Sequence, residues 1–597
     1  MYGSTFLSAL LPAVWLLFTG YDKRWAGDDG FINLRVVHQL MAGNGFVYNA
    51  GERTEVVTSA GWVLVLWLVG ELGLDLQTAA WVLSLGLSAL GLFMAALATA
   101  RVREDEATPS TLVLPLGVLA YAAIPVSWEY ATSALENGLG LGFLGTSYYL
   151  VARAATGKRD RGHACSAVFC GLAPLVRPDF SIFGAALILV LLLLARDWKT
   201  RVRVALCAAV PGVAFEIFRM GYFACLVPNT ALAKEAFATH WAQGYQYLQD
   251  MLSSYALQLP VLAAVLSLAA SSVGLLRAPP HIRLRVPVVM AGAGALHVLY
   301  IVRVGGDFMH GRLLLPGLFG IFAGAAVVQL PLSHIKRGEL QGTRLRAIAV
   351  GALLAGALLL NVGWSVYCAR HLHSLPSAYG INDERRYYVE TSGTAHPTRA
   401  EDYRDHIYYA GPFSIRRRIA ERCPFGAPAM QDESRVECPR FALPDGTEGV
   451  LTDQPPDVLL PLEPSSTAPF VLGVMGFRPL GIAGLAVGLR MNVVDGFSLA
   501  DPLASRMEVL ARGRPGHEKF FNTWWFAAKY VADGATHDER VLTARRVLRC
   551  GLVAELHAAT RDPMTFSRFV RNMRLAFVLH GLRIPTDPHE AERKFCS

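Results

Sequence analysis

Long apolar stretches separated by short polar segments fill the first 367 residues of the chain. A helix needs about 20 mostly apolar residues to cross a bilayer, and stretches near this length predict about eleven transmembrane helices. The first stretch lacks a basic leader and a small-residue cleavage site, which indicates an anchor rather than a cleaved signal. The predicted helices lie near residues 4–20, 77–100, 111–128, 135–152, 164–177, 180–195, 204–222, 254–276, 286–303, 312–331 and 347–367.

The pattern changes after residue 367, where short apolar runs alternate with Pro, Gly and aromatic residues. We therefore predict two domains, a polytopic α-helical membrane domain over 1–367 and a mixed or β-rich aqueous domain over 368–597. The second domain is predicted from apolar runs at Phe470 to Met475 and Gly484 to Val494, and from helical patterns near 540–558 and 563–580.

Composition supports a membrane protein. Hydrophobic residues make up 53% of the chain and charged residues 17%, against about 25% charged in soluble domains. Between the first two long stretches, a loop over about 21–76 contains the apolar run Gly61 to Gly70. This run is too short to span a bilayer, so it predicts a re-entrant or interfacial helix.

Basic residues gather in alternate loops, and such loops face the cytoplasm. The other loops, which contain Asp28 and Asp29, and all of 368–597 are then expected on the outer, periplasmic face of the plasma membrane. The net charge of +8 is dispersed between apolar stretches, so we expect a bilayer and no nucleic acid as a partner. The basic loops contain Arg101 and Arg103; Lys158, Arg159 and Arg161; Lys199, Arg201 and Arg203; Arg277, Arg283 and Arg285; and Lys336, Arg337, Arg344 and Arg346.

The nine cysteines show no metal-binding spacing. Four of them lie in the predicted outer domain, where disulfides form. Cys423–Cys438 and Cys550–Cys596 are the pairs we favour, because they close a short loop and tie down the C-terminus, and other pairings stay open.

The adjacent carboxylates of Asp28 and Asp29 follow the first apolar stretch directly. Ionisable groups beside a membrane segment are costly unless they sit in a polar pocket. One of the two is equally explained as an N-terminal cap of a short amphipathic helix over Ile32 to Met41. Because neighbouring side chains point in different directions, we expect divided roles, with one acid reacting and the other orienting or binding.

Cationic and polar residues gather at other outer loops. Arg and Lys suit a phosphate ligand, Arg through its planar fork and Lys as a point charge. The ordinary alternatives are a tight turn with a local ion pair at Arg177, a helix start beside an exposed Lys234, and a structural His310. The candidate group for donor phosphate and sugar comprises Lys234, Arg312, Arg177, His310, Asp307 and Asn229.

A second group of polar residues is a candidate for binding an acceptor. Glu55 and Asn44 lie in the first outer loop, where a solvated loop is the alternative. Glu136 lies one turn into a predicted helix, where a structural salt bridge is as good an interpretation as a substrate contact. The chain has no HExxH motif, P-loop or dinucleotide fingerprint, which argues against a nucleotide-sugar donor.

Several motifs together resemble the mycobacterial terminal β-(1→2)-arabinofuranosyltransferase (AftB) family, whose members have the GT-C fold. The resemblance covers both predicted domains, and the first-loop motif is its most specific part. The matching motifs are Asp28-Asp29-Gly30-Phe31-Ile32-Asn33-Leu34-Arg35, Ala42-Gly43-Asn44-Gly45, Asn49-Ala50-Gly51-Glu52-Arg53, Pro228-Asn229-Thr230 with Ala233-Lys234, Gly305-Gly306-Asp307, Asp501-Pro502 and Gly516-His517-Glu518-Lys519.

The resemblance implies decaprenyl-phosphoryl-arabinofuranose as the donor. It implies arabinan chains of arabinogalactan and lipoarabinomannan as the acceptor, and an outer domain that binds carbohydrate, with His517 a candidate contact. Donor and product of the family are both β-linked, so the reaction retains configuration. Retention needs a carboxylate nucleophile or same-face attack through an ion pair. We expect Asp29, and after it Asp28, to carry the catalytic role.

Two other functions stay open at this point. A GT-C enzyme using another polyprenyl-phosphate sugar, such as mannose, would share the acid pair. A transporter or non-catalytic envelope protein would place ionisable groups near the bilayer midplane in repeats, and here they gather at one face without an evident repeat. No cofactor is required by the sequence. A divalent metal stays open, although no set of three or four ligands is recognisable.

Overall fold

The computed structural model divides the chain into two compact units, and each is assembled from separated segments. The first comprises 1–25, 80–214 and 239–387, and the second comprises 26–79, 215–238 and 388–597. The structure describes residues 3–102, 111–157, 162–266, 285–325, 327–331, 380–406, 408–410, 441–442, 448–451, 458–461, 472–476, 480–489, 491–509, 516–519, 522–530 and 538–596, and single positions 356, 363, 366, 367 and 413.

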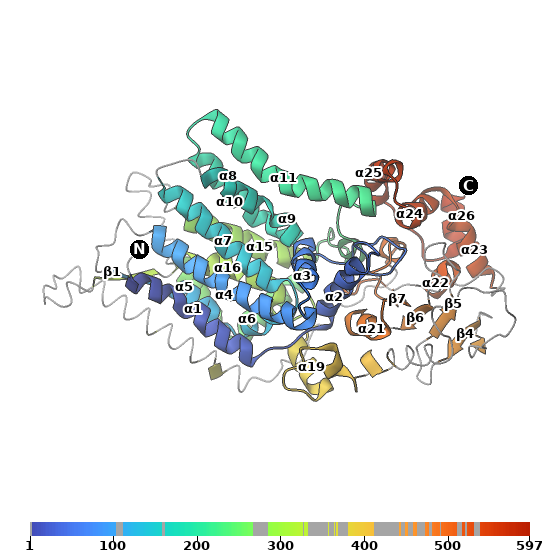
Figure 1. The fold of residues 1–597 in the computed structure, drawn as a ribbon, viewed down its shortest axis with the longest axis horizontal. Coiled ribbons are helices and arrows are strands. Elements are labelled where there is room, and N and C mark those ends of the chain that lie inside the picture. The colour runs from blue at the N-terminus through green and yellow to red at the C-terminus, as the bar shows by residue number, and fades with distance from the viewer. Residues whose placement is uncertain are drawn as a thin grey trace. The chain divides into compact units, whose positions relative to one another are not determined.

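The first unit is built from roughly aligned helices (Figure 1). Its helices include the beginning of α11, and α4 and α11 both pass from one unit into the other. The helices are α1 (Gly3–Asp22), α4 (Leu76–Val102), α5 (Leu116–Ala122), α6 (Pro125–Tyr130), α7 (Asn137–Thr156), α8 (His163–Gly171), α9 (Ala173–Val176), α10 (Ser181–Leu194), α11 (Trp198–Phe223), α13 (Trp241–Ser254), α15 (Arg285–Val304) and α16 (Leu315–Ala323), with 3₁₀ turns η3 (Pro178–Phe180) and η5 (Arg312–Leu314).

Glycines allow neighbouring helices of this unit to approach closely. A Cβ on Gly145 of α7 would lie 1.9 Å from the carbonyl oxygen of Gly91 on α4, and one on Gly138 would lie 2.1 Å from that of Ser84. Small residues at such crossings are typical of helices packed within a bilayer, where close backbone contact replaces the hydrophobic driving force.

Within the described residues, three helices are long and apolar enough to cross a membrane, namely α4, α11 and α15. Several predicted spans are shorter in the structure. The stretch 111–128 is not one helix, because Thr111–Pro115 forms β1, antiparallel to β2 (Val327–Pro331), and a break at Ile124 precedes Pro125 at the start of α6. The predicted helix 312–331 is also too long, because α16 ends at Ala323 and the last five residues form β2. Most of 347–367 and the end of 254–276 lie outside the described residues.

The second unit contains the loop over residues 26–79 together with residues 215–238 and the C-terminal part of the chain. The run Gly61 to Gly70 forms a short helix, as predicted. The helices of this unit, with α19 passing into it, are α2 (Asp28–Met41), α3 (Ala60–Glu71), α12 (Asn229–Ala233), α19 (Glu384–Ser392), α21 (Leu480–Val487), α22 (Thr523–Tyr530), α23 (Glu539–Val547), α24 (Gly551–Arg561), α25 (Phe566–His580) and α26 (Pro588–Phe595), with 3₁₀ turns η6 (Ala400–Tyr403) and η7 (Ala504–Arg506). The predicted boundary between 367 and 368 stays a prediction.

A five-stranded sheet of order β3-β4-β5-β6-β7 belongs to this unit. Its strands pair antiparallel except β6 and β7, which are parallel and joined through α21 (Figure 1). The mixed character of the C-terminal part therefore agrees with the sequence pattern. The strands are β3 (Phe441–Ala442), β4 (Glu448–Leu451), β5 (Val458–Pro461), β6 (Leu472–Gly476) and β7 (Met491–Asp495).

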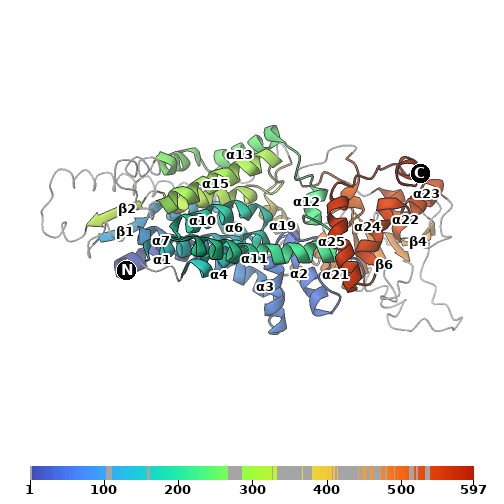
Figure 2. The same cartoon turned by 90° about the horizontal axis from the view of Figure 1, so that it is seen from above.

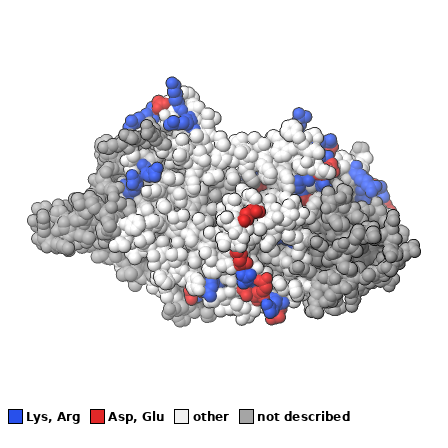
Figure 3. Space-filling view, viewed as in Figure 1, with Lys and Arg blue, Asp and Glu red and all other residues white. Residues whose placement is uncertain are grey.

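Buried side chains from α22 to α26 form the core of the C-terminal helices, centred on Trp525, Leu556 and Leu579. A disulfide between Cys550 and Cys596 joins the start of α24 to the end of α26. Cys423 and Cys438 lie outside the described residues. On the face seen in Figure 3, the surface over the helices of the first unit is almost free of charged side chains, and Lys and Arg gather where α11 begins.

Candidate active site

The two adjacent acids lie in the first turn of α2, in the second unit, and have different surroundings. The Asp28 carboxylate is buried and accepts backbone hydrogen bonds from Gly481 (2.9 Å) and Ile482 (2.7 Å) in the first turn of α21. Burial raises the pKa of Asp28 to about 7, although both hydrogen bonds lower it. Asp28 therefore joins the start of α2 to the C-terminal part of the chain.

Asp29 is half-buried, and its side chain points about 100° away from that of Asp28 around the helix. The predicted cap is not formed in the expected way, because Gly27 occupies the N-cap position without a side-chain hydrogen bond. Of the two acids, Asp29 is the more accessible to a substrate.

A close approach between α2 and α21 makes this arrangement possible. A Cβ on Gly481 would lie 1.8 Å from the Asp28 carbonyl oxygen, and a Cβ on Gly484 would lie 2.4 Å from the Tyr48 hydroxyl. Arg35 is fully buried beside them and donates to the carbonyl oxygens of Tyr48, Gly484 and Gly488. The sequence assigned no role to Arg35, which appears there only within the first-loop motif.

Polar residues of the loop that follows α2 mostly form contacts within the same unit. Asn44 donates to the Gln39 side chain at 2.7 Å. Glu55 is buried and accepts two hydrogen bonds from Arg219, at 2.6 and 3.1 Å, and burial raises its pKa. These two candidate acceptor contacts therefore lie within structural networks.

Glu52, in the same loop, is buried as well. It pairs with Lys529 at 2.7 Å and Arg561 at 3.2 Å, and Lys529 also contacts Asp501 at 2.5 Å. Burial alone would raise the pKa of Glu52, but the two cations lower it to about 2. A buried charge is retained where partners such as these compensate its desolvation.

Two further candidates lie at the ends of α12. Asn229 is its first residue, and Lys234 directly follows its last. The Asn229 amide donates to the Leu499 carbonyl at 2.7 Å and accepts from the Ser505 hydroxyl at 2.7 Å. It therefore connects the start of α12 to both of these residues. Lys234 is half-buried at the end of α12, and no ion pair of its ammonium occurs among the described residues.

His517, the last candidate in this unit, is buried with its ring 4.2 Å from that of Phe497. The preceding turn is organised by Asp495, which accepts backbone hydrogen bonds from Phe497, Leu499 and Ala500. Burial raises the pKa of Asp495 to about 6. Sequence analysis did not single out Asp495.

The remaining candidates lie in the first unit, where all of them except His310 form one network. Glu136 is buried, and its Oε1 accepts from Arg177 and from Arg312, both at 3.0 Å. Arg177 also contacts Asp179 at 3.0 Å, and Asp307 lies 3.8 Å from Arg312. The network continues from Asp179 to His297, 2.8 Å away.

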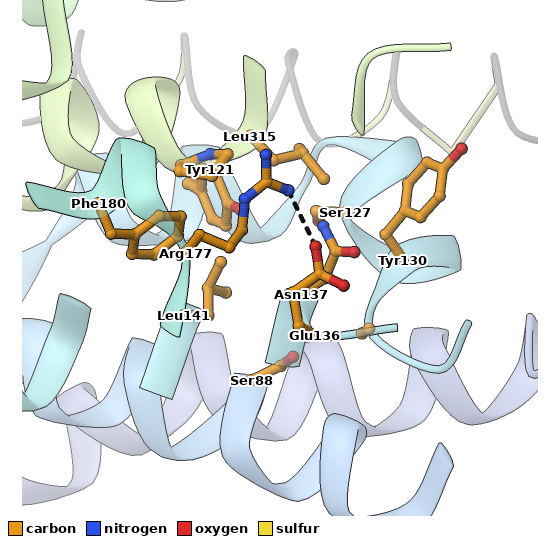
Figure 4. A pocket seen from close by; sticks show the side chains of 12 residues that line it. Ser88, Tyr121, Ser127, Tyr130, Glu136, Asn137, Leu141, Arg177, Phe180 and Leu315 are labelled. Atoms are coloured by element: carbon orange, nitrogen blue, oxygen red, sulfur yellow. Dashed lines mark hydrogen bonds and ion pairs between the residues drawn. The ribbon is translucent and has the colours of Figure 1, made fainter. Parts of the chain in front are cut away.

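A small cavity borders this network. Glu136 and Arg177 line it together with Tyr121, whose buried hydroxyl has no hydrogen-bond partner in the described structure (Figure 4). Its volume of about 10 Å³ has room for about one water molecule and is too small for a sugar. In this structure Glu136 serves the ion-pair network rather than an open substrate pocket.

His310 is engaged in a separate contact of the first unit. Its Nδ1 lies 2.5 Å from Asp250 and its Nε2 lies 3.1 Å from the Tyr255 hydroxyl. Burial opposes the charged form, but the hydrogen bond and charge of Asp250 raise the pKa of His310 above its ordinary value. No group of three or more His, Cys, Asp or Glu that could hold a metal ion occurs in the described part of the chain.

Comparison with known proteins identifies the family. The model of the AftB family C-terminal domain matches residues 471–594. Over 98% of its length the chain is 33% identical to the terminal β-(1→2)-arabinofuranosyltransferase of Mycobacterium tuberculosis, and it covers 96% of that protein. It is 29% identical, over 99% of its length, to the protein of the same name from Corynebacterium glutamicum, and covers 88% of it.

The apolar helices and these similarities together define a membrane glycosyltransferase. Within that class the acid pair and the α2–α21 contact lie in the segments that carry the similarity. The chain belongs to the family of terminal β-(1→2)-arabinofuranosyltransferases.

Proposed function

We propose that this chain transfers arabinofuranose from decaprenyl-phosphoryl-arabinose to the non-reducing ends of cell-wall arabinan, forming terminal β-(1→2) linkages. The observation that carries the proposal is the similarity to two proteins of that name over nearly the whole chain. A related transferase that uses another polyprenyl-phosphate sugar, such as mannose, is the alternative. The reaction takes place on the periplasmic face of the plasma membrane in this proposal.

Asp29 is the reacting acid in this proposal, and Asp28 is a positioning residue. The support is the contrast in their surroundings, since Asp28 is occupied by Gly481 and Ile482 whereas Asp29 is half-buried on another side of the helix. A carboxylate held in this way fixes the first turn of α2 and so orients its neighbour.

Retention of the β configuration gives Asp29 one of two roles. As a nucleophile it forms a bond to the anomeric carbon while the bond to the donor phosphate breaks. The acceptor hydroxyl then displaces the carboxylate and gives its proton to the released lipid phosphate. In same-face attack it stabilises the developing oxocarbenium ion, and the departing phosphate accepts the proton of the acceptor hydroxyl. In both routes the lipid phosphate leaves with the electron pair of the broken bond.

Lys234 is our choice for the donor phosphate. Arg177 and Arg312 share the Glu136 carboxylate, and each also has an aspartate partner, so their charge is already compensated. His310 is paired with Asp250. The Lys234 ammonium has no ion pair within the described ranges of the chain, and a lysine binds phosphate as a point charge.

The proposal is tested by donor competition with the purified full-length protein in vesicles. Transfer of the donor's sugar to a short synthetic arabinan is measured with decaprenyl-phosphoryl-arabinose, and in a separate reaction with decaprenyl-phosphoryl-mannose. We expect transfer only from the arabinose donor, with a β-(1→2) linkage in the product. Transfer from the mannose donor alone would establish the alternative enzyme, and transfer from neither donor would contradict the proposed function.

A further inference from the structure

The C-terminal helix α25 has an apolar stripe on the side that does not pack into its own unit. Phe566, Val570, Met573 and Phe577 follow one another at spacings of four, three and four residues, which places them on one face of a helix. Phe566 is 85% exposed and Phe577 is 65% exposed, while Val570 and Met573 are partly exposed. The opposite face buries Asn572, Ala576 and Leu579.

Basic residues accompany this stripe. Arg568, Arg571 and Arg574 follow at intervals of three residues, and α25 contains no acidic residue. Arg568 pairs with Asp562 and Arg571 with Glu555, whereas Arg574 is exposed and has no ion pair among the residues described. The helix therefore presents an apolar band with positive charge along one edge, a combination typical of helices that lie on anionic membranes.

The packing of α25 places this band beside a candidate membrane helix. Phe569 lies against Gly221 near the end of α11, and the Asn572 amide donates to the Gly221 carbonyl at 3.0 Å. Figures 1 and 2 both show α25 beside this end of α11. Around α25, Phe569 neighbours the exposed stripe, so the stripe continues directly from the contact with α11.

Gly221 also belongs to the lipid-facing side of α11. The exposed residues Leu206, Val210, Val213 and Ile217 recur at spacings of four, three and four, and Gly221 is the next position in that series. On a helix long and apolar enough to cross a membrane, such an exposed stripe is where acyl chains pack. The side chain of Phe569 covers the end of this stripe, so α25 crosses α11 where the stripe reaches its last turn.

We propose that α25 is an interfacial helix that lies in the headgroup region of an anionic phospholipid bilayer. Phe566, Val570, Met573 and Phe577 insert toward the acyl chains, and Arg574 contacts lipid phosphate. The occupant is a bilayer rather than a protein, because the stripe continues the exposed apolar side of α11 and is bordered by Arg574, with no acidic residue in α25. The helix thus anchors the C-terminal part of the chain at the membrane surface.

The test is photo-cross-linking of the full-length protein in vesicles. The aromatic photoprobe p-benzoylphenylalanine replaces Phe577, and intact-mass spectrometry after illumination detects lipid adducts. Vesicles of phosphatidylglycerol are compared with vesicles of phosphatidylcholine. Replacement of Leu206 on α11 is the positive control, and replacement of the exposed Glu539 on α23 is the negative control. An unchanged thermal unfolding midpoint shows that each variant is folded.

We expect phospholipid adducts at positions 577 and 206 and none at 539. The additional substitution Arg574→Glu should lower the adduct yield at 577 about fivefold in phosphatidylglycerol and leave it unchanged in phosphatidylcholine, because each basic group near an anionic surface favours binding by about that factor. A yield at 577 no higher than at 539, or cross-links at 577 to protein instead of lipid, would overturn the proposal.

Discussion

Two neighbouring aspartates with the same chemistry are separated in this protein by what surrounds them. Asp28 is buried against the amide groups of Gly481 and Ile482, and Asp29 is left half-buried. The same principle applies to the basic candidates, where the ion pairs of Arg177 and Arg312 set them apart from Lys234. At the scale of residues, partners rather than residue type decide which groups are available for chemistry.

Lys234 allows the phosphate assignment to be tested directly. Replacing Lys234 with Ala should lower kcat/KM for the lipid donor roughly 10- to 100-fold, because a hydrogen bond to a charged group contributes about 1.5–3 kcal/mol. Initial rates over a range of donor concentrations provide the measurement. Lys234→Arg retains the charge and should recover part of the loss. Lys594→Ala is the matched control, because Lys594 pairs with Glu508 and is not one of the candidate site residues. An unchanged kcat/KM in Lys234→Ala would remove Lys234 from the site.

Glu52 gives a prediction about stability and pH. Its pKa is lowered from 4.5 to about 2, so its contribution to the free energy of unfolding is complete above pH 4.5 and is lost as the pH falls toward 2. Breaking a buried ion pair costs about 3–5 kcal/mol, and Glu52→Gln should lower the thermal unfolding midpoint and flatten its dependence on acid pH.

The control for Glu52 is another glutamate that pairs with an arginine. Glu592 pairs with Arg546 at 2.6 Å, but both side chains are partly exposed. Exposed pairs contribute little to stability, so Glu592→Gln should leave the unfolding midpoint nearly unchanged. Equal effects of the two substitutions, measured by intrinsic fluorescence during heating, would contradict the role given to Glu52.

At the scale of elements, the contact between α2 and α21 sets the geometry of the acid pair. Gly481→Ala would place a Cβ against the Asp28 carbonyl oxygen, and overpacking of this kind costs about 1–3 kcal/mol. We expect a lower unfolding midpoint and a loss of transferase activity larger than the loss of folded protein. Gly581→Ala is the control, because a Cβ there meets nothing within 4 Å and its φ is −85°. Full activity in folded Gly481→Ala would show that this contact does not position the acids.

Elements with strong periodicity were predictable from the sequence, and short apolar runs were not. The predicted helix near 563–580 is α25, and the amphipathic pattern from Ile32 to Met41 lies within α2. The run Gly484 to Val494 was assigned to β-rich structure, yet its first part completes α21 before β7 begins. A short apolar run has no distinctive period, so packing decides between helix and strand.

At the scale of the whole molecule, the candidate site depends on contacts between distant segments. Asp28 and Gly481 are 453 residues apart, and Asn229 meets Leu499 across 270 residues. Local patterns identified the acids and the family motifs, because each of these consists of residues that are neighbours in the sequence. Local patterns did not reveal that residues 26–79 and 215–238 form one compact unit with 388–597. Contacts between segments this far apart in the sequence leave no local pattern.

The central claim is that this chain transfers arabinofuranose and uses Asp29 to do so. The most direct measurement is transfer from decaprenyl-phosphoryl-arabinose to a short arabinan by the wild-type protein, Asp29→Asn and Asp28→Asn, each with its unfolding midpoint. We predict that Asp29→Asn keeps the wild-type midpoint and loses about 10²–10⁴-fold in rate, whereas Asp28→Asn also loses stability. Wild-type activity in folded Asp29→Asn would contradict the account.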